Sequence, residues 1–212
     1  MPRILIVDDH PLVRQGLKAG LSKAPDLKVI GEAETADEAL TEARNQRPDI
    51  ILLDISLPGR NGFEVLRQLH AEMPEVRILM LSTYSEKQYA VRCLRNGAWG
   101  YLTKKSSSDE LIDAVRTVMQ GRKYITSSLA QLLASEVSAD SAKLPHEDLS
   151  DREFQILCLI GQGKTVAQIA EILSIGTSTV GTHRVHIFEK MNMHSTVELV
   201  RYALENKLVD NV

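Results

Sequence analysis

Four short, largely apolar runs, each followed by a polar side chain, constrain the fold of this chain more than any other feature. The polar residues at the ends of these runs are Asp8 and Asp9, Asp54, Ser82, and Lys104. Parallel strands deliver their last residues to the same edge of a sheet, and open α/β sheets bind ligands at that edge. We therefore expect three carboxylates, a hydroxyl group and an ammonium group to converge on one site.

The first 124 residues alternate between strand and helix patterns. The expected strands are 3–7, 28–33, 49–53, 77–82 and 99–103. Apolar residues recur at helical spacing between them, and Thr35 and Ser107 each precede a Glu by three residues, as capping residues do. The pattern predicts a doubly wound α/β fold, a five-stranded parallel sheet with helices on both faces. A flavodoxin-like strand order, 2-1-3-4-5, would bring the acids together, although the alternation alone does not select that order.

The rest of the chain has a different character. Residues 125–145 are interpreted as a linker with a short helix at 127–136, because small and polar residues follow that helix. Four further helices are expected near 150–162, 166–174, 177–192 and 195–207. A tight turn that contains Gly176 joins the middle pair, which is typical of a helix-turn-helix unit. The predicted domains are 1–124, the linker, and a small all-α domain at 146–212.

The last helix carries two apolar stripes. We expect the first stripe to face the domain core, and it comprises Val197, Val200 and Leu204. The second stripe is a candidate dimer interface, with ordinary packing on the other helices as the alternative, and it comprises Leu199, Tyr202 and Ala203.

Composition and charge limit the classes of function. No run approaches the roughly 18 apolar residues of a membrane span, and Asp8 comes too early for a signal peptide, so we expect a cytoplasmic protein. Cys93 and Cys158 are expected to be buried free thiols. Residues 146–212 hold 6 Lys/Arg against 9 Asp/Glu, a formal charge of −3. A DNA-binding role for this segment therefore requires its cations to gather on one face.

The polar residues at the strand ends suit phosphoryl transfer to a carboxylate. A carboxylate can attack phosphorus and form an aspartyl phosphate, and Mg²⁺ neutralises the charge of the anionic donor. We expect Asp9 and Asp54 to be direct Mg²⁺ ligands and Asp8 to act through water. Lys104 would neutralise a phosphoryl oxygen, and Ser82 would donate a hydrogen bond to another. A single Asp after a strand is often only a helix cap, but five polar groups at strand ends make coincidence improbable.

Residues 1–124 resemble the receiver domain of two-component response regulators. The resemblance rests on the strand-end residues above, on Leu57-Pro58-Gly59 after Asp54, and on the run Gly100-Tyr101-Leu102-Thr103-Lys104. It implies that Asp54 accepts phosphate from a sensor histidine kinase and that Asp8, Asp9 and the backbone carbonyl of Ser56 help to hold Mg²⁺. It also implies that Ser82 and Tyr101 form a switch pair that moves inward on phosphorylation. Lys105 stands where the family usually has Pro, and Thr83 stands where many members have Ala.

Residues 149–204 resemble the LuxR-type helix-turn-helix. The resemblance rests on Leu149-Ser150, Arg152-Glu153, Gly163, Ile169-Ala170, Leu173, Thr179-Val180, His183 and Lys190. A receiver, a linker and this domain make up the NarL/FixJ architecture, which implies a regulator of transcription that binds double-stranded promoter DNA. A homodimer is implied on phosphorylation or on DNA binding, and RNA polymerase is a further candidate partner.

The helix at 177–192 would lie in the major groove. The candidate DNA contacts are Thr177, Ser178, Thr179, Gly181, Thr182, His183, Arg184 and Lys190. His186 fits a DNA contact and a solvated helix face equally well. A zinc site of His183, His186 and His194 is not favoured, because no cysteine or carboxylate lies at ligand spacing in the sequence.

Two glycines depart from the LuxR-type pattern. Gly176 stands where the family often has a capping Ser, and Gly181 stands where Lys is frequent. Gly181 either allows the backbone to approach DNA or simply lacks a contact. The missing cation and the acidic charge predict weak binding by one domain, which two tethered copies would offset.

Two other functions remain open. A phosphatase that passes through an aspartyl phosphate is one, although such enzymes want an Asp at the position of Ser56. A regulator that works without phosphorylation is the other, and the complete acidic pocket disfavours it. We expect a protein that catalyses only its own phosphorylation and dephosphorylation.

Overall fold

The computed structural model describes residues 1–84, 86–138 and 144–209. The chain divides into two compact units, Met1–Leu133 and Ala134–Val212, and each is described by itself. Residues 139–143 of the expected linker lie outside the described residues. Within the described ranges, no helix combines the length and apolar character needed to cross a bilayer.

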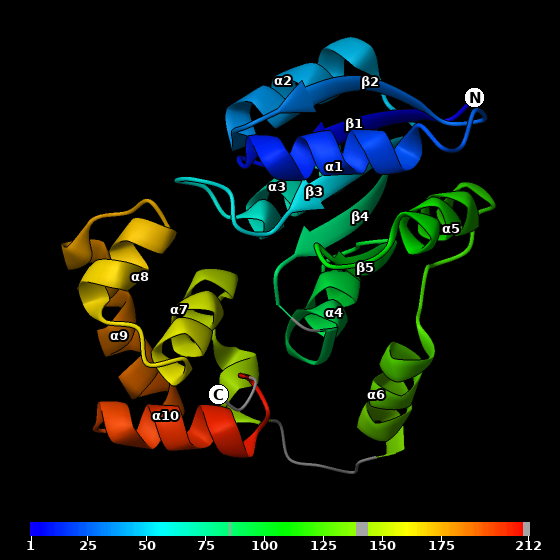
Figure 1. The fold of residues 1–212 in the computed structure, drawn as a ribbon. Coiled ribbons are helices and arrows are strands. Elements are labelled where there is room, and N and C mark those ends of the chain that lie inside the picture. Colours follow the sequence, from blue (N-terminus) through cyan, green and yellow to red (C-terminus); the bar gives the residue numbers. More distant parts are fainter. Residues whose placement is uncertain (85, 139–143, 210–212) are drawn as a thin grey trace. The chain divides into compact units, whose positions relative to one another are not determined.

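The first unit contains a five-stranded parallel sheet in the order β2-β1-β3-β4-β5 (Figure 1). The strands are β1 (Arg3–Val7), β2 (Lys28–Ala33), β3 (Ile50–Asp54), β4 (Arg77–Ser82) and β5 (Gly100–Thr103). This is the predicted flavodoxin-like order, in which β1 and β3 are neighbours. Every residue of β3 is buried, as expected for a parallel strand covered on both faces.

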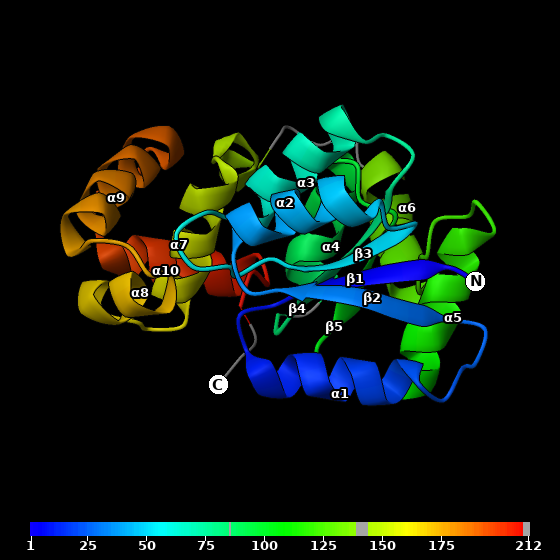
Figure 2. The same cartoon turned by 90° about the horizontal axis from the view of Figure 1, so that it is seen from above.

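Helices cover both faces of the sheet. They are α1 (Pro11–Leu21), α2 (Ala36–Gln46), α3 (Gly62–Glu72), α4 (Glu86–Arg95) and α5 (Ser108–Met119). The helices α1 and α5 pack together on one face, while α2 and α3 pack together on the other (Figure 2). The doubly wound α/β fold predicted from the sequence is therefore confirmed.

The helix starts follow the predicted caps, with one refinement. At Ser107 the full capping box forms, because Ser107 Oγ accepts from Glu110 N–H and the Glu110 carboxylate accepts from Ser107 N–H. At Thr35 only half of the box forms, because the Glu38 carboxylate accepts instead from the N–H of Glu34. Either arrangement satisfies N–H groups that the first turn of a helix leaves without partners.

The start of the expected linker packs on the first unit. Helix α6 (Ser127–Ser138) begins beside α4, where Thr126 Oγ1 donates to Glu86 Oε2 at 2.7 Å. Leu129 of α6 is fully buried, and Tyr124 N–H donates to the carbonyl of Trp99. The division between the two units falls inside α6, at residues 133 and 134.

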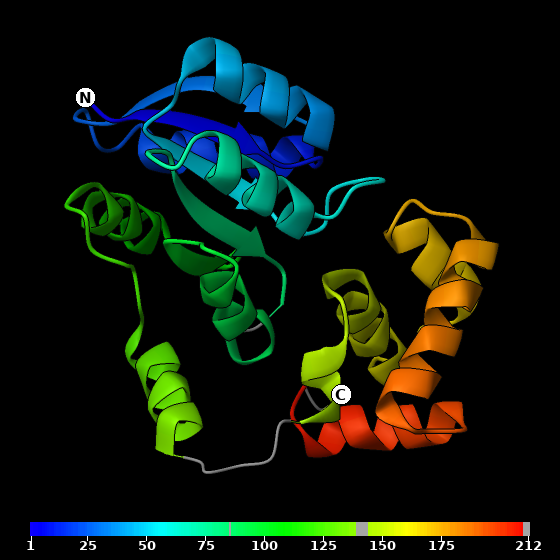
Figure 3. The same cartoon turned by 180° about the vertical axis from the view of Figure 1, so that it is seen from behind.

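The second unit is helical (Figure 3). A short 3₁₀ helix, η1 (Pro145–Asp148), precedes α7 (Asp151–Gly161), α8 (Val166–Ile172), α9 (Thr177–Met191) and α10 (Thr196–Glu205). The turn between α8 and α9 has the predicted position, and its left-handed residue is Ser174 with φ 50°. Gly176 instead caps α9 with extended backbone and no side-chain hydrogen bond. The predicted all-α helix-turn-helix domain is confirmed.

The expected core face of α10 is wrong. Leu199 and Ala203 are fully buried, whereas Val197 is 77% exposed and Leu204 is 40% exposed. A Cβ atom built on Gly161 of α7 would lie only 2.7 Å from the Cβ atom of Ala203. The close approach of α7 and α10 at this glycine therefore favours burial of the stripe that contains Ala203. Leu199 and Ala203 pack inside the unit, as the alternative of ordinary helix packing predicted, while Tyr202 of the same stripe is half-buried.

Candidate functional site

The strand ends bring Asp8, Asp54 and Lys104 into direct contact. The Lys104 ammonium donates to Asp54 Oδ2 at 2.8 Å. It also lies 2.7 Å from Asp8 Oδ2, close enough for an ion pair, although that contact is not aligned as a hydrogen bond. The side chains of Asp8 and Asp54 are 0% and 1% exposed. Two carboxylates and one ammonium group thus face one another in a site largely shielded from water.

The backbone around Asp54 is closely packed. Asp54 is the last residue of β3, and the next residue, Ile55, continues to pair with β4 through its N–H and the carbonyl of Leu81. The loop after Ile55 returns to the end of β3 at Gly62, where the Gly62 N–H donates to the carbonyl of Ile55. A Cβ atom on Gly62 would lie 2.2 Å from the carbonyl oxygen of Asp54, so only glycine fits there.

The environment of Asp54 opposes its ionisation. Burial raises the pKa of Asp54 from 3.8 to about 6, with the Asp8 carboxylate contributing in the same direction. The Lys104 ammonium and the N–H of Ser56 act the other way, but do not cancel the cost of burial. Burial lowers the pKa of Lys104, but the two carboxylates outweigh that effect and leave the pKa above its usual value. Additional positive charge in this site would therefore favour the ionised form of Asp54.

The donor set suits a hard divalent cation. Asp8, Asp9, His10 and Asp54 each offer one donor atom, and these atoms all lie within 4.8 Å of one another. Asp54 Oδ1 is buried and has no hydrogen-bond partner among the described residues. Mg²⁺ prefers oxygen ligands from one or two carboxylates and keeps several waters. The three Asp side chains fit this ion, as the sequence predicts, and they define a candidate metal centre.

Ser82 and Tyr101 lie beside this centre. Ser82 ends β4 with 1% exposure, and its Oγ accepts a hydrogen bond from Tyr84 N–H at 3.1 Å. Tyr101 is fully buried, and its hydroxyl donates to the carbonyl oxygen of Tyr84 at 2.7 Å. Burial raises the pKa of Tyr101, and a hydrogen bond with Ser82 opposes that rise. The aromatic side chain of the expected switch pair therefore already points inward.

Two residues of this region were missed by the sequence reasoning. The His10 ring lies with Nδ1 2.7 Å from Asp9 Oδ1, and His10 is also the residue that precedes α1. Arg14 is 8% exposed, and its guanidinium donates to the carbonyl of Asp8 at 2.7 Å and to the Glu32 carboxylate at 3.2 Å. The position of His10 directly after the acidic pair was the available signal. For Arg14, which points inward from α1, the sequence contained no such signal.

The expected DNA-contact residues are distributed over α9. The exposed ones are Thr177, Ser178, Thr179, Thr182 and Lys190, and the half-buried ones are Gly181, His183 and Arg184. The Lys190 ammonium donates to Glu153 Oε2 of α7 at 2.7 Å. The Arg184 guanidinium donates to Thr196 Oγ1 at 3.0 Å and lies over the Phe188 ring. Both cations therefore already have partners within the unit, which the sequence did not indicate.

Two comparisons with known proteins bear on these units. Residues 4–116 match the response regulator receiver domain, and residues 147–203 match the luxR family of bacterial regulatory proteins. The response regulator UvrY of Escherichia coli K12 is 36% identical over 209 residues, which span 98% of this chain and 96% of that protein. The response regulator GacA of Pseudomonas protegens is 37% identical over 210 residues, 99% of each chain.

Solved structures agree with this similarity. A LuxR-family two-component response regulator from Aurantimonas is 34% identical and covers 66% of this chain and 99% of its own, with a TM-score of 0.61. RcsB from Salmonella enterica serovar Typhimurium covers 95% of this chain and 98% of its own with a TM-score of 0.66, and at 20% identity it shows the fold alone. The chain belongs to the NarL/FixJ family of response regulators and has a receiver domain followed by a LuxR-type DNA-binding domain.

Proposed function

We propose that Asp54 accepts a phosphoryl group from a sensor histidine kinase and that this modification controls DNA binding by α9. The observation that carries the first part is the buried contact of Asp54 with Lys104 beside the carboxylate of Asp8. The unpartnered Oδ1 of Asp54 is the oxygen available to attack phosphorus, since Oδ2 accepts from Lys104. The phosphoryl group would leave the kinase and form a bond to Asp54.

The other residues of the centre have distinct roles. Asp8, Asp9 and Asp54 would hold Mg²⁺ with their carboxylates, and the carbonyl of Ser56 would complete the site. The ion supplies the positive charge that lets an anionic donor approach a carboxylate. Lys104, placed between Asp8 and Asp54, would transfer its ammonium contact to a phosphoryl oxygen. Ser82 would release its hydrogen bond with Tyr84 and donate to another phosphoryl oxygen.

A labelling experiment tests this assignment. Incubation with acetyl phosphate and Mg²⁺ should add one phosphoryl group, and Asp54→Asn should abolish the addition. Asp37→Asn is the matched control, since Asp37 is an exposed acid of the same unit whose carboxylate forms a surface ion pair with Arg60. Labelling that persists in Asp54→Asn, or that requires no divalent cation, would refute the assignment.

Ser82 and Tyr101 are proposed as the switch pair. Both side chains form hydrogen bonds with the backbone of Tyr84, which follows β4. Loss of the Ser82 contact would therefore leave the backbone after β4 with one fewer hydrogen bond to hold it in place. Because Tyr101 is already buried, phosphorylation would act by stabilising an inward arrangement rather than by creating it. The change would then alter the surface that the receiver offers to a second copy or to residues 146–212.

The DNA-binding surface is proposed to be α9. Its first turns expose the hydroxyl groups of Thr177, Ser178 and Thr179, which suit contacts with phosphate oxygens. Thr182, His183 and Arg184 follow on the next turn, with Gly181 between the two groups. Arg184 would leave Thr196 to reach a guanine edge or a phosphate. Lys190 contributes mainly by tying α9 to α7.

Dimerisation is proposed to supply affinity that one domain lacks. Residues 146–212 carry a formal charge of −3, and phosphate neutralisation dominates DNA affinity. Two tethered copies would raise the effective concentration of the second. In related folds, RcsB has been solved bound to promoter rprA with the phosphomimetic BeF3⁻, and as two dimers bound to two parallel DNAs. RNA polymerase is proposed as a further partner.

A mobility-shift assay with the phosphorylated protein tests the role of α9. Arg184→Ala should weaken binding to a selected promoter fragment by more than about tenfold. The matched control is Arg201→Ala, since the Arg201 side chain is 75% exposed on α10 and forms a surface pair with Glu205. Equal shifts for the wild-type protein and Arg184→Ala would argue against α9 as the reading helix.

The proposed function assigns no other reaction to the protein. We infer that it catalyses only its own Mg²⁺-dependent phosphorylation and dephosphorylation, because Ser56 offers no general acid where a related phosphatase would use Asp. The domains are proposed as 1–124, a linker at 125–145 and 146–212. A function that requires contact with DNA supports a cytoplasmic location.

A further inference from the structure

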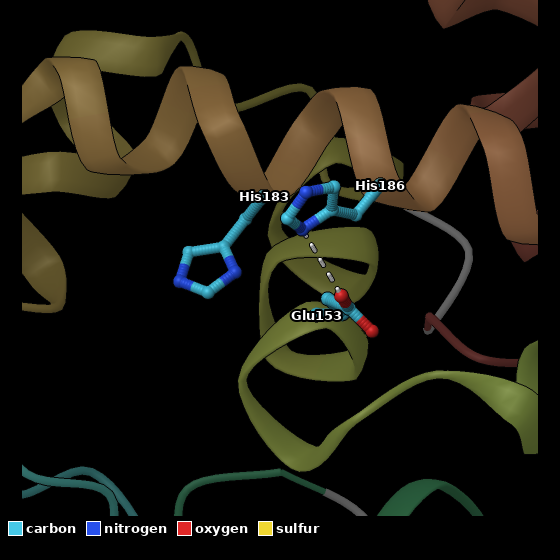
Figure 4. A group of neighbouring side chains, drawn as sticks. All are labelled: Glu153, His183 and His186. Carbon is cyan, nitrogen blue, oxygen red and sulfur yellow. Dashed lines mark ion pairs between the residues drawn. The ribbon is translucent and has the colours of Figure 1, made fainter.

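Three side chains of the second unit gather between α7 and α9. Glu153 lies near the start of α7, and His183 and His186 lie one turn apart on α9. Figure 4 shows both rings on the side of α9 that faces α7, with the Glu153 carboxylate between α7 and the His186 ring. Each residue offers one donor atom, and the three atoms all lie within 4.8 Å of one another.

The two oxygens of Glu153 have different surroundings. Oε2 accepts from Ser150 N–H at 2.8 Å and from the Lys190 ammonium at 2.7 Å. Oε1 lies 3.7 Å from His186 Nδ1, which is longer than a hydrogen bond. The side chain is only 5% exposed, so its position is set by the helix cap and by Lys190. Glu153 therefore presents one oriented oxygen toward the histidines.

The two histidines are suited to the same ligand. Residues three apart on a helix share a face, so both rings can approach one point beside Glu153. The Nδ1 atom of His183 is buried and has no hydrogen-bond partner among the described residues. Burial also lowers the pKa of His183, which favours the neutral imidazole that binds metals. His186 is 50% exposed and can rotate.

We propose that Glu153, His183 and His186 form a binding site for a divalent transition-metal ion of the zinc class. Imidazole and carboxylate are the donors of such sites, and three protein ligands leave a fourth position for water. Bonds of about 2.1 Å allow two ligands of one zinc ion to lie at most about 4.2 Å apart. The observed upper limit of 4.8 Å is slightly longer than this, so the side chains must draw together when the ion binds, and the half-exposed ring of His186 is free to adjust.

Neighbouring charges shape the affinity of this site. The Arg152 guanidinium and the Lys190 ammonium both oppose a second positive charge near His183. Lys190 keeps its hydrogen bond to Oε2, however, and carboxylates that bind metals are usually held in place by such hydrogen bonds. The site therefore holds a metal on Oε1 while Oε2 remains bound within the protein. Its two nitrogen donors separate it from the oxygen-rich receiver site, which suits Mg²⁺.

The spacing of these residues in the sequence does not predict this site. In the sequence the two histidines have no third ligand at metal-binding spacing, and His194, the third histidine of this segment, is not part of the cluster. Glu153 lies thirty positions before His183 and reaches it only because α7 packs on α9. An occupied site would add positive charge to the segment proposed to bind DNA, a consequence that depends on the proposed function, whereas metal binding itself does not.

Histidine NMR signals of the full-length protein test the proposal. The chain has six histidines, so zinc chloride can be titrated while each imidazole is observed. An excess of Mg²⁺ is included to occupy the receiver site. We expect the signals of His183 and His186 to shift together and to saturate at one equivalent of zinc, with no change at His194, which is exposed on the same unit.

Two variants complete the test. His186→Gln should weaken zinc binding by at least about tenfold, while His194→Gln should leave it unchanged. Both positions are exposed, so neither change removes a buried group. The proposal is overturned if zinc shifts only the His10 signal, if His194 responds as strongly as His186, or if His186→Gln binds zinc as tightly as the wild-type protein. None of these measurements requires phosphorylation or DNA binding, so their failure leaves the proposed function standing.

Discussion

Replacing Asp54 by Asn should stabilise the metal-free receiver at neutral pH. Asn has nearly the shape of the protonated acid and carries no charge that burial would penalise. The pKa of Asp54 is about 6 in the folded protein, against 3.8 for an ordinary Asp. The folded state therefore holds the proton more tightly than the unfolded chain, and the wild-type protein loses stability as the pH rises from about 4 to 6.

The size of this effect follows from the two pKa values. A difference of about two pKa units corresponds to about 3 kcal/mol, which is the upper limit of the gain for Asp54→Asn above pH 6. Below about pH 4 the acid is protonated in both states, so the gain should vanish. With Mg²⁺ present, the wild-type protein should be the more stable of the two, because Mg²⁺ binds its folded site and stabilises it by mass action.

Urea unfolding with excess chelator measures the effect. Trp99 is the single tryptophan of the chain and packs against the core of the first unit, so its fluorescence reports the receiver. The free energy of unfolding of Asp54→Asn should exceed that of the wild-type protein by a margin that grows between about pH 4.5 and pH 7. Asp37→Asn, at an exposed position, should show no such trend. An Asp54→Asn variant that is less stable than wild type at pH 8, or a margin independent of pH, would refute the reasoning.

Three further substitutions probe the same account. Lys104→Met leaves the buried carboxylates of Asp8 and Asp54 without their cation. It should cost about 3 kcal/mol or more of unfolding free energy at pH 7, but less at pH 5. Lys105→Met, at an exposed position, should have little effect. Gly62→Ala places a Cβ atom against the Asp54 carbonyl and should destabilise the receiver by about 1–3 kcal/mol. The control Gly16→Ala meets nothing within 4 Å and should stabilise α1 by up to about 1 kcal/mol. Equal unfolding midpoints for the two variants would contradict this expectation. Gly181→Ala also meets nothing within 4 Å and should stabilise the second unit by about 1 kcal/mol in thermal unfolding. If Gly181 serves close approach to DNA, the same variant should bind DNA more weakly, and unchanged binding would mean that it merely lacks a contact.

The sequence was sufficient to predict the sheet and the acidic centre. Strand patterns and strand ends are local properties, and parallel connection places all such ends at one edge, so Asp8, Asp54 and Lys104 could be brought together without coordinates. The strand order was the added assumption, and the structure confirms it.

Contacts between distant segments could not be predicted in the same way. The pair between Lys190 and Glu153 joins residues 37 positions apart, and Arg14 reaches Glu32 and the Asp8 backbone from α1. Periodicity says which face of a helix is apolar, but it does not say which polar groups of another helix lie opposite.

The error in α10 has a similar cause. Two stripes with helical spacing run along this helix, and their apolar content alone favoured the stripe with Val197 and Leu204. The stripe that is buried contains Ala203, because Gly161 of α7 lets Ala203 approach more closely than a larger residue would. A glycine in one helix and a small residue in another become informative only once their packing is known.

The central claim is that a phosphoryl group is transferred to the carboxylate at the end of β3. Reduction of the acyl phosphate with borohydride, followed by peptide mass spectrometry, identifies the modified residue directly. The account predicts a single reduced site at Asp54, formed only when Mg²⁺ is present. Modification at Asp8 or Asp9 instead, or at a histidine or serine outside this edge of the sheet, would contradict it.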